Sequence, residues 1–536
     1  MSMFFDLNHR DDAGQIECDI CVVGSGPAAI SLALQFVDSP IRVCMLESGG
    51  FNRERKVQRL CQGESVGYAL ANGLSGSRSR FFGGSSNCWA GACTPLDAID
   101  FMKRDWVPHS GWPINEQTLA PYCDAAQKAC LIGSNIYDDR LVDGDPMQSF
   151  AFSPDTLEMA YWQFSSEPRL GKHYHDVFAK SSNISVILYA NVTKILTNAD
   201  ASHVQSVLVQ SLRGKKVEVR ASRFVLACGG IENARLLLAS NEVISQGLGN
   251  ENDLVGRFFM EHPVCASATV VPERADDPRI AFLNAFHEPW PQYQGTLFNP
   301  LIKTTETFQQ CHRILNSAVY VVDHDSEFSE GLMAAVRVRQ ALLEGRIPEE
   351  FLQDALKIIA DFRSVATAAY GRYVRYGAAR RRLGLKVQAE TVPNPDSRVT
   401  LSEKRDAFGA PVAKLNWKLT ELDRRTMDVI VDTVTEEFAR LGLAKIERDQ
   451  WMNDAPDSFP DDMRGGVHHT GTTRMSRNPA DGVVNEDCRL HTVDNLYIAG
   501  SSVFPTNSWA NPTLTICRLA IRLAEHLKQS WRSRGA

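Results

Sequence analysis

Two polar side chains in the C-terminal part of the chain have the chemistry needed to take a proton from a hydroxyl group and to hold its oxygen. His468 lies in a polar stretch flanked by glycines, and Asn511 follows it after an apolar strand, 495–499, that ends at Gly500. Histidine is the side chain best suited to act as a base near neutral pH, and an asparagine amide can donate a hydrogen bond to an oxygen. The spacing predicts one base and one amide donor near a shared point.

The N-terminal part of the chain carries a nucleotide-binding fingerprint. An apolar strand, 18–23, runs into a Gly-x-Gly-x-x-Ala turn at 24–29, and an apolar helix follows. A second apolar strand, 41–46, ends at Glu47. The glycines let the backbone approach a pyrophosphate at a helix N-terminus, and an acid after the second strand can hold a ribose hydroxyl. This order of elements predicts a dinucleotide-binding unit rather than a glycine turn in an ordinary parallel sheet.

Composition argues against several other classes of protein. The chain has 536 residues, enough for roughly two or three domains, and a net charge of −7 without a long basic tract, which argues against a nucleic-acid partner. Thirteen scattered cysteines, several in apolar strands, are typical of reduced thiols in a cytoplasmic protein. We expect no metal site, no secretion signal and no transmembrane segment.

The elements must position these residues in an α/β protein. We predict a Rossmann-like nucleotide-binding domain assembled from the discontinuous segments 16–94, 182–265 and 465–536. The ranges 95–181 and 266–464 are predicted to form a substrate-binding domain of sheet and helices. Of these, 95–181 is predicted to be a helical, polar segment.

The middle of the chain returns to strand patterning. A strand is predicted at 184–189, followed by a hairpin-like pair near 204–209 and 216–219. A buried strand at 224–228 then runs into a second glycine turn, and a helix is predicted over 231–238.

A helical, basic segment at 348–386 stands apart from this pattern. Apolar residues recur near helical spacing between 348 and 385, which predicts one long helix or two. The charged residues between 362 and 389 are all positive. A solvated helix with cations near its C-terminus is one interpretation, because the helix dipole favours them there. A patch over 362–386 for an anionic substrate, a lipid surface or an electron-acceptor partner is the other.

Taken together, the motifs resemble those of the glucose–methanol–choline (GMC) flavin oxidoreductases. The resemblance rests on the glycine turn 24–29, the glycine-rich loop 83–89, the second glycine turn 227–233, and the stretches around His468 and Asn511. Two weaker matches lie at 255–263 and 393–399. The sequence around Asn511 is most similar to the sugar-oxidising branch, which includes pyranose oxidase and bacterial sugar dehydrogenases.

The resemblance implies FAD as cofactor and assigns a set of binding positions. They comprise the diphosphate turn, the ribose acid, the loop beside the flavin ring, a valine on the adenine side, the second glycine turn, and the last flavin strand with the pyrimidine edge. In this sequence the matching residues are Gly24, Gly26, Pro27, Ala28, Ala29, Glu47, Ser48, Gly83, Gly84, Ser85, Asn87, Cys88, Trp89, Ala90, Val192, Ala227, Gly229, Asn233, Gly500, Ser501, Asn511, Pro512 and Thr513.

The resemblance also implies the reaction. The catalytic histidine of the family lies six residues before an Arg-Met pair, which selects His468 rather than His469, and the partner position matches Asn511. The implied reaction is oxidation of a primary or secondary alcohol, such as a sugar or polyol, by hydride transfer to flavin N5, with His468 as base and Asn511 holding the oxygen. The acceptor, dioxygen or another carrier, stays open. Alternatives are an electron-delivering subunit for a membrane or haem partner and a non-oxidative FAD lyase.

The mode of FAD attachment is a separate question. Some relatives link FAD covalently through a histidine that immediately precedes the tryptophan of the glycine-rich loop. Here that position is Cys88, before Trp89. We expect a buried packing thiol and non-covalent FAD, with a linkage through Cys88 as the minor alternative.

Overall fold

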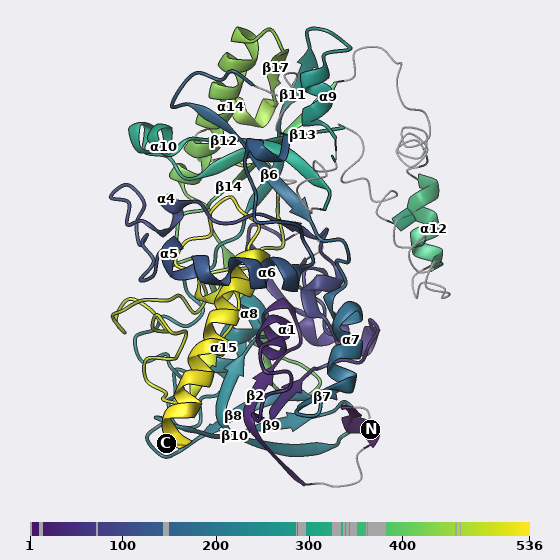
Figure 1. The fold of residues 1–536 in the computed structure, drawn as a ribbon, viewed down its shortest axis with the longest axis vertical. Coiled ribbons are helices and arrows are strands. Elements are labelled where there is room, and N and C mark those ends of the chain that lie inside the picture. Colours follow the sequence, from purple (N-terminus) through teal and green to yellow (C-terminus); the bar gives the residue numbers. More distant parts are fainter. Residues whose placement is uncertain are drawn as a thin grey trace.

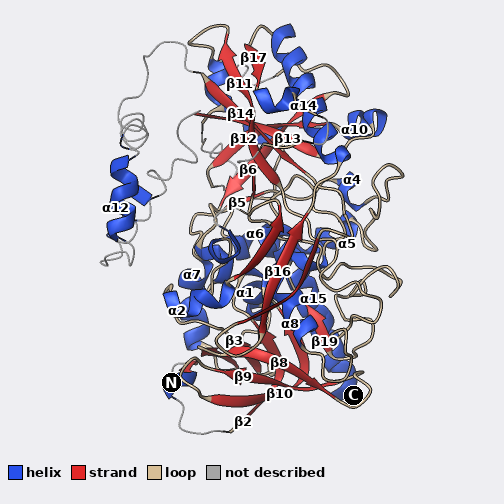
Figure 2. Ribbon diagram, turned by 180° about the vertical axis from the view of Figure 1, so that it is seen from behind, coloured by secondary structure: helices blue, strands red, loops and turns tan. Residues whose placement is uncertain are grey.

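Two large sheets lie one above the other along the long axis of the molecule, and each draws strands from distant parts of the sequence (Figure 1). The computed structural model describes residues 3–9, 14–70, 73–142, 150–285, 287, 296–323, 334–335, 338, 342, 351–360, 362, 382–455, 458–460 and 463–535. Figure 2 shows the same arrangement from behind, with a smaller three-stranded sheet between the two large ones.

The lower sheet is parallel at its centre and mixed at its edges. Within the described residues its order is β1-β7-β3-β2-β10-β9-β8, and β19 also pairs with β10. The strands β3, β2, β10 and β19 run parallel to one another. Their inner residues are apolar and buried, as expected for parallel strands covered by helices on both faces. The bounds are β1 (Phe4–Asp6), β2 (Gln15–Val23), β3 (Val43–Leu46), β7 (Ile184–Leu188), β8 (Asn191–Thr197), β9 (Val204–Gln210), β10 (Lys216–Leu226) and β19 (Leu496–Ile498).

Among the described residues, four helices lie around the parallel strands. The predicted helix after the first glycine turn is confirmed as α1 (Pro27–Leu34), which begins with proline at a position where that residue is favoured. It packs against the long C-terminal helix α15 (Thr513–Gly535), drawn in yellow in Figure 1. The helix after the second glycine turn is α8 (Gly229–Ala239), and α7 (Leu170–Lys180) completes the set.

The predicted hairpin and the predicted buried strand that follows it form one continuous element. β9 and β10 are antiparallel, with Val217 opposite Val209, as the hairpin pattern predicted. β10 then runs on through Leu226, so the pairing partner of β2 and the hairpin strand are the same strand.

The upper sheet is mainly antiparallel and lies between helix α14 (Glu421–Arg440) and the lower half of the molecule (Figure 2). Its order in the described residues is β17-β11-β14-β13-β12-β6-β5, with β18 also paired to β11. One face packs on α14, and the other carries Trp162, Tyr320 and Gln388 on three of its strands. The bounds are β5 (Ala92–Cys93), β6 (Leu157–Phe164), β11 (Pro263–Pro272), β12 (Phe298–Thr304), β13 (Ser317–Asp323), β14 (Leu383–Ala389), β17 (Ala444–Arg448) and β18 (Arg464–Gly465).

Shorter elements join these layers. The small sheet contains three strands in the described residues, and short helices occupy the connections. The bounds are β4 (Gly63–Gly67), β15 (Arg398–Arg405), β16 (Pro411–Trp417), α2 (Arg55–Gln58), α3 (Gly73–Gly76), α4 (Ala98–Phe101), α5 (Glu116–Leu119), α6 (Cys123–Cys130), α9 (Pro278–Leu283), α10 (Glu306–His312) and α12 (Phe351–Ala360).

Two sequence predictions of helix are wrong in part. The segment 95–181 contains β6, in which Leu157 and the residues 160–163 are buried in the upper sheet and Glu158 is exposed. The predicted helix 348–385 is confirmed for α12, but its end is wrong, because Leu383 begins β14 and pairs with Asp323 of β13. Most residues of both strands are buried, and a short buried strand is difficult to distinguish from a buried helix segment by periodicity alone.

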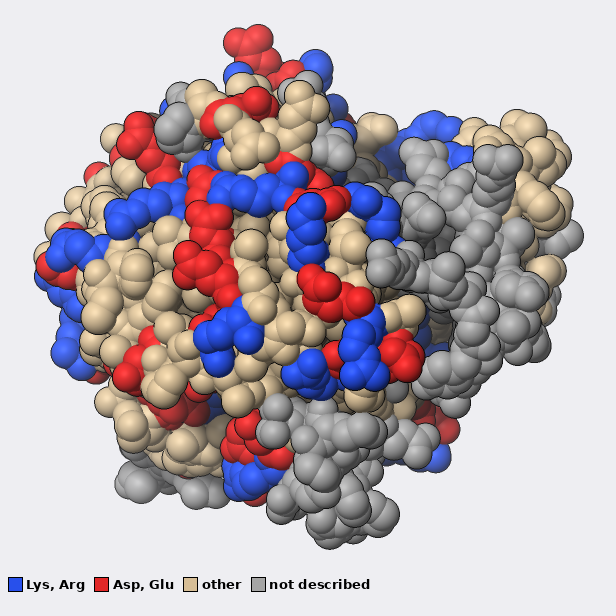
Figure 3. Space-filling model, turned by 90° about the horizontal axis from the view of Figure 1, so that it is seen from above, with Lys and Arg blue, Asp and Glu red and all other residues tan. Residues whose placement is uncertain are grey.

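One residue of the predicted basic surface at 362–386 is wrong, because Lys386 is buried within β14. Arg382 is exposed and pairs with Glu447 at 2.6 Å. The other cations of the segment lie outside the described residues. On the end of the molecule seen in Figure 3, positive and negative side chains are interspersed. No helix in the described ranges is long and apolar enough to cross a bilayer.

Candidate active site

The first glycine turn and the glycine-rich loop lie directly against each other. The N–H of Gly83 donates a hydrogen bond to the carbonyl oxygen of Ser25 at 3.2 Å. A Cβ atom built on Gly84 would lie 2.7 Å from the Cα of Gly26, closer than side chains can approach a backbone. The two loops that were predicted to bind one cofactor are therefore neighbours, and their contact requires glycine.

The second glycine turn approaches the first from the adjacent strand. Gly24 has φ +111°, and a Cβ atom there would lie 2.4 Å from the carbonyl oxygen of Ala227. Both residues directly follow a parallel strand of the lower sheet, β2 and β10. Crevices at the carboxyl ends of such strands are where α/β sheets bind nucleotides.

Glu47 lies at the end of β3, beside the first glycine turn. Its carboxylate is buried and accepts hydrogen bonds from Ser25 Oγ at 2.5 Å, the Gly49 N–H at 2.9 Å and Ser48 Oγ at 3.1 Å. Burial raises the pKa of this carboxyl group, and these hydrogen bonds act in the opposite direction. A carboxylate held in this place can accept hydrogen bonds from ribose hydroxyls.

The N-terminus of α8 connects the second glycine turn to the histidine stretch. Asn233 accepts a hydrogen bond from the Cys228 N–H at 2.9 Å and donates one to Ser502 Oγ at 3.0 Å. A Cβ atom on Gly230 would lie 2.4 Å from the carbonyl oxygen of His469. The same carbonyl accepts a hydrogen bond from Ser501 Oγ at 2.7 Å. The histidine stretch is thereby fixed against the nucleotide-binding turns.

The backbone of His468 is held in place by a buried carboxylate group. The backbone N–H of His468 lies 2.8 Å from both carboxylate oxygens of Glu261, whose side chain has no solvent exposure. The N–H of His262 also donates to Glu261, at 2.9 Å. The rings of His262 and His468 lie 5.0 Å apart at an interplanar angle of 85°.

The imidazole of His468 is held in its basic form. Burial lowers its pKa to about 4, so the ring is neutral at ordinary pH. Its Nδ1 atom is enclosed and has no hydrogen-bond partner in the described parts of the chain, while the residue as a whole is partly exposed. The accessible side of the ring is therefore the side of Nε2, the nitrogen able to receive a proton.

Asn511 lies just before α15 and is held by the upper sheet. Its Oδ1 accepts a hydrogen bond from Gln388 Nε2 at 2.9 Å, and its Nδ2 donates to the carbonyl oxygen of Ala92 at 3.2 Å. Gln388 belongs to β14, where it pairs with Val264 of β11, three residues after Glu261. The anchor of Asn511 thus lies on β14, and the anchor of His468 lies just before the adjacent strand β11.

The remaining predicted positions lie around these loops. Asn87 donates to the carbonyl oxygen of Phe82 at 3.0 Å, and Trp89 Nε1 donates to that of Pro168 at 2.5 Å. Val192 on β8 lines a cavity of about 50 Å³ together with Arg80. Pro512 immediately precedes α15 and Thr513 begins it, at the N-terminus that carries the positive end of the helix dipole.

The expectation that Cys88 is a buried packing thiol is wrong. The residue is exposed and ends the short helical turn Gly84–Asn87, where its thiol contacts the carbonyl oxygen of Ser85 at 3.3 Å. The short helical turn Gly84–Asn87 leaves this side chain exposed, which the apolar neighbours Trp89 and Ala90 did not indicate.

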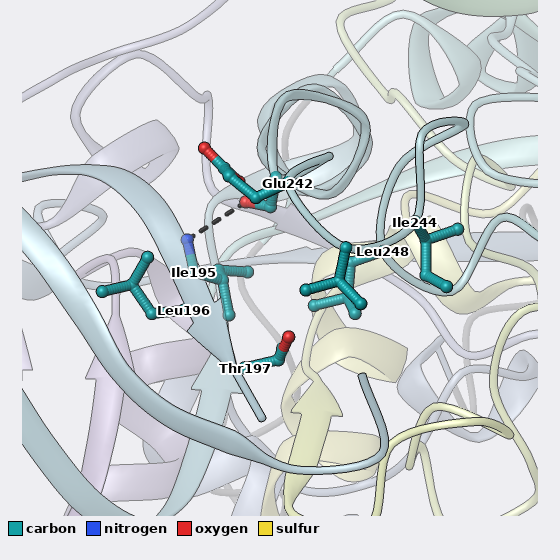
Figure 4. A pocket seen from close by; sticks show the side chains of 8 residues that line it. Ile195, Leu196, Thr197, Glu242, Ile244 and Leu248 are labelled. Atoms are coloured by element: carbon teal, nitrogen blue, oxygen red, sulfur yellow. Dashed lines mark hydrogen bonds between the residues drawn. The ribbon is translucent and has the colours of Figure 1, made fainter. Parts of the chain in front are cut away.

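A second small cavity does not belong to this set of residues. It has a volume of about 70 Å³ and lies between β8 and the chain after α8, where Ser240 Oγ accepts a hydrogen bond from the Ile195 N–H at 3.1 Å (Figure 4). Thr197 and Leu248 also line it. Pockets for small molecules usually exceed about 300 Å³, and this cavity contains none of the predicted site residues.

Sequence reasoning missed two of the residues that position the site. Glu261 precedes the strand β11, and its only signal was that it adjoins the weak His-Pro match at 262–263. Gln388 falls in Leu383–Ala389, where Lys386 and Gln388 alternate with apolar residues. That two-residue alternation was the available signal for a strand with a polar face.

The fold and the site together define a class of protein. Three glycine turns, of which Gly24 and Gly84 leave no room for a side chain, and the buried acid Glu47 fit a dinucleotide. The adjoining neutral imidazole of His468 adds a base. These features are those expected of a dinucleotide-dependent oxidoreductase.

Comparison with known proteins specifies the family. Models of the GMC oxidoreductases match residues 173–264 and 393–520. 2-methyl-1,2-propanediol dehydrogenase of Mycolicibacterium austroafricanum is 24% identical over 585 residues, covering 96% of this chain and 95% of its own. Pyranose 2-oxidase of Tricholoma matsutake is 24% identical over 503 residues, covering 87% and 76%. The crystal structure of pyridoxine 4-oxidase from Mesorbium loti has a TM-score of 0.58 at 16% identity, covering 96% and 99%.

The chain belongs to the GMC oxidoreductase family. It is an oxidoreductase, and its family binds FAD. Relatives that it matches include a dehydrogenase named for 2-methyl-1,2-propanediol. The predicted family and the predicted α/β fold are confirmed.

The buried carboxylate of Glu261, which binds the backbone of His468, provides a first prediction. Glu261→Gln is expected to slow flavin reduction by substrate at least roughly tenfold and to lower the unfolding temperature. The amide would set an N–H2 group against the backbone N–H groups of His468 and His262, and each unpaired buried group costs about 1–3 kcal/mol. Stopped-flow spectroscopy and thermal unfolding measure the two effects.

Glu437 on α14 provides a matched control, because it is also a buried carboxylate and accepts hydrogen bonds from Ser153. Glu437→Gln is expected to lower stability while the rate of flavin reduction stays within about twofold. Equal rate losses in both variants would show that Glu261 has only a general structural role.

Proposed function

We propose that the protein oxidises a primary or secondary alcohol of a sugar or polyol to the carbonyl, with His468 as the base. The observation that supports this most directly is the neutral, partly accessible imidazole of His468, fixed by Glu261 next to the nucleotide-binding turns. When bound, FAD would accept the hydride of the carbinol carbon at its N5 atom.

His468 would remove the hydroxyl proton at Nε2, because Nδ1 is enclosed by protein. An alcohol is a weak acid, so its oxygen must be stabilised while negative charge develops. Asn511 would supply that stabilisation through an amide N–H. Both side chains would hold the substrate oxygen on the side of the site that faces the upper sheet. Gln388 lies there on β14, and Glu261 lies just before β11.

The chain's own residues would hold FAD in three segments. The ranges 16–94, 182–265 and 465–536 would form the FAD-binding domain, and 95–181 with 266–464 the substrate-binding domain. Glu47 would bind the ribose, the turns at Gly24 and Gly84 the diphosphate and the flavin side, and Val192 the adenine side. Support comes from the contact of these loops at the carboxyl ends of β2 and β10.

We propose that FAD is not covalently attached, which leads to a second prediction. Acid precipitation of the yellow protein is expected to release essentially all flavin into the supernatant, where its absorbance is measured. Cys88→Ser should release the same fraction. The exposed thiol of Cys88 is the alternative attachment point, so flavin that stays with the wild-type pellet but leaves with the Cys88→Ser protein would contradict non-covalent binding.

The proposed function is tested by anaerobic titration of the purified holoenzyme with sugars, polyols and 1,2-diols. We expect at least one of them to bleach the flavin absorbance in proportion to the amount added. The matched control is dithionite, which reduces any accessible flavin. Bleaching by dithionite but by none of the alcohols would contradict the function.

A further inference from the structure

We propose that Gln388 is a positioning residue that determines which edge of the Asn511 amide faces the substrate. The inference rests on the proposed role of Asn511 as the donor to the substrate oxygen. Gln388 itself lies behind Asn511 on β14 and acts through it.

The orientation of both amides follows from two backbone carbonyl groups that can only accept hydrogen bonds. Gln388 lies 2.6 Å from the carbonyl oxygen of Trp509, so the atom facing Trp509 must be its Nε2. The same Nε2 meets Asn511 at 2.9 Å, so the Asn511 atom on that side must be Oδ1. The opposite end of the Asn511 amide faces the carbonyl oxygen of Ala92 at 3.2 Å, as required of Nδ2.

This arrangement leaves one donor for a substrate. The NH2 group of Asn511 has two hydrogens, and Ala92 takes one of them. Among the described residues, the second has no acceptor, so it is available to the oxygen of an alcohol. A flipped Asn511 would set N–H against N–H at Gln388 and oxygen against oxygen at Ala92, and would present an acceptor to an oxygen that is gaining negative charge.

Gln388 is well suited to this task because it cannot easily move. It is 5% exposed and Asn511 is 8% exposed, so little water competes for their hydrogen bonds. β14 is paired on both sides, with Val264 and Ala318 opposite Gln388. The neighbouring side chain, Val387, is fully buried on the face that packs against α14.

A double-mutant cycle tests the proposal. FAD-loaded wild-type protein, Gln388→Leu, Asn511→Ala and the double variant are mixed anaerobically with the alcohol that bleaches the wild-type flavin, and the limiting rate of reduction is measured. We expect Asn511→Ala to slow reduction by about 10²-fold and Gln388→Leu by roughly 10- to 100-fold. In the double variant, Gln388→Leu should slow reduction by less than about a further twofold, because its effect on the rate depends on Asn511.

The pH profile of Gln388→Glu distinguishes positioning from general packing. An ionised carboxylate cannot donate to Trp509 or Asn511, whereas a protonated one can donate one hydrogen bond. The reduction rate of this variant is expected to rise by at least threefold as pH falls, while the wild-type rate does not. A readout independent of turnover is the flavin difference spectrum with the carbonyl product, whose dissociation constant should rise in Gln388→Leu.

Gln309 provides a matched control. It is a buried glutamine on α10 that likewise donates to a backbone carbonyl, that of Thr304, and to an asparagine oxygen, that of Asn316, both at 3.0 Å. Gln309→Leu should lower the unfolding temperature and leave the reduction rate within about twofold.

The outcomes separate the role of Gln388 from that of Asn511. Multiplicative rate losses in the double variant, or equal losses in the Gln388 and Gln309 variants, would overturn the role of Gln388 and leave that of Asn511 intact. An unchanged rate in Asn511→Ala would overturn the proposed role of Asn511 and the inference with it.

Discussion

His468→Ala is expected to keep its FAD and to lose about three orders of magnitude in the rate at which substrate reduces the flavin. General-base catalysis contributes about 10²–10⁴-fold, and His468 is the side chain fixed beside the nucleotide-binding turns with an accessible nitrogen. The variant should purify yellow, because His468 itself makes none of the glycine-turn contacts. Anaerobic stopped-flow absorbance measures the rate.

The rate of flavin reduction by substrate is expected to fall at acid pH. Because burial depresses the pKa of His468 to about 4, the basic form is present above that pH and is lost only as pH falls through it. The wild-type reduction rate should therefore be flat from about pH 8 to about pH 5 and fall below, and this acid limb should be absent in His468→Ala.

His469→Ala is the comparison that tests the choice between the two neighbouring histidines. His469 is buried, and its Nε2 lies 3.6 Å from Glu261, so its loss should affect stability more than rate. A strong rate loss in His469→Ala together with near-normal reduction in His468→Ala would assign the role of base to His469 instead.

Gly24→Ala is expected to yield protein without bound FAD and with a clearly lower unfolding temperature. The added Cβ would lie 2.4 Å from the carbonyl oxygen of Ala227, and φ is +111°, which side chains rarely adopt. Either β2 or β10 must shift, and the shift displaces the turn meant for the diphosphate. The flavin content per protein and the melting temperature measure the effect.

Gly214→Ala is the control that separates the effect of a positive φ from the effect of the steric clash at Gly24. Gly214 has φ +85°, but no atom lies within 4 Å of the position that an added methyl group would take, and it occupies the turn between β9 and β10. This variant should retain full flavin content with only a small loss of stability, on the order of 1 kcal/mol. Full flavin content in Gly24→Ala as well would contradict the assignment of that turn to the cofactor.

The parts of the site that could be predicted from the sequence are those whose signal is local. Gly24, Glu47 and the helix between them lie within one strand–turn–helix–strand unit. In such a unit the residue type at each position follows from the local backbone conformation. His468 is selected by its distance from Arg474-Met475, which is also a local pattern.

The anchors of the site could not be predicted in this way. Glu261 and Gln388 are far apart in sequence and become neighbours only through the antiparallel pairing of β11 with β14. The apolar spacing up to Leu385 predicts helix, and the short alternation at Lys386 and Gln388 can indicate a strand but not the strand it pairs with. The error at Cys88 has a related cause, since whether a loop residue faces inward depends on a turn that propensity does not specify.

The pairing of Asp323 with Leu383 has a consequence for how the protein can diversify. The last residue of β13 and the first residue of β14 lie directly opposite each other. A connection of any length can therefore join the two strands. Loop closure becomes only slowly more costly as a loop grows. Insertions and deletions at this point can therefore accumulate over evolution, or be grafted by design, without altering the register of the strand that carries Gln388.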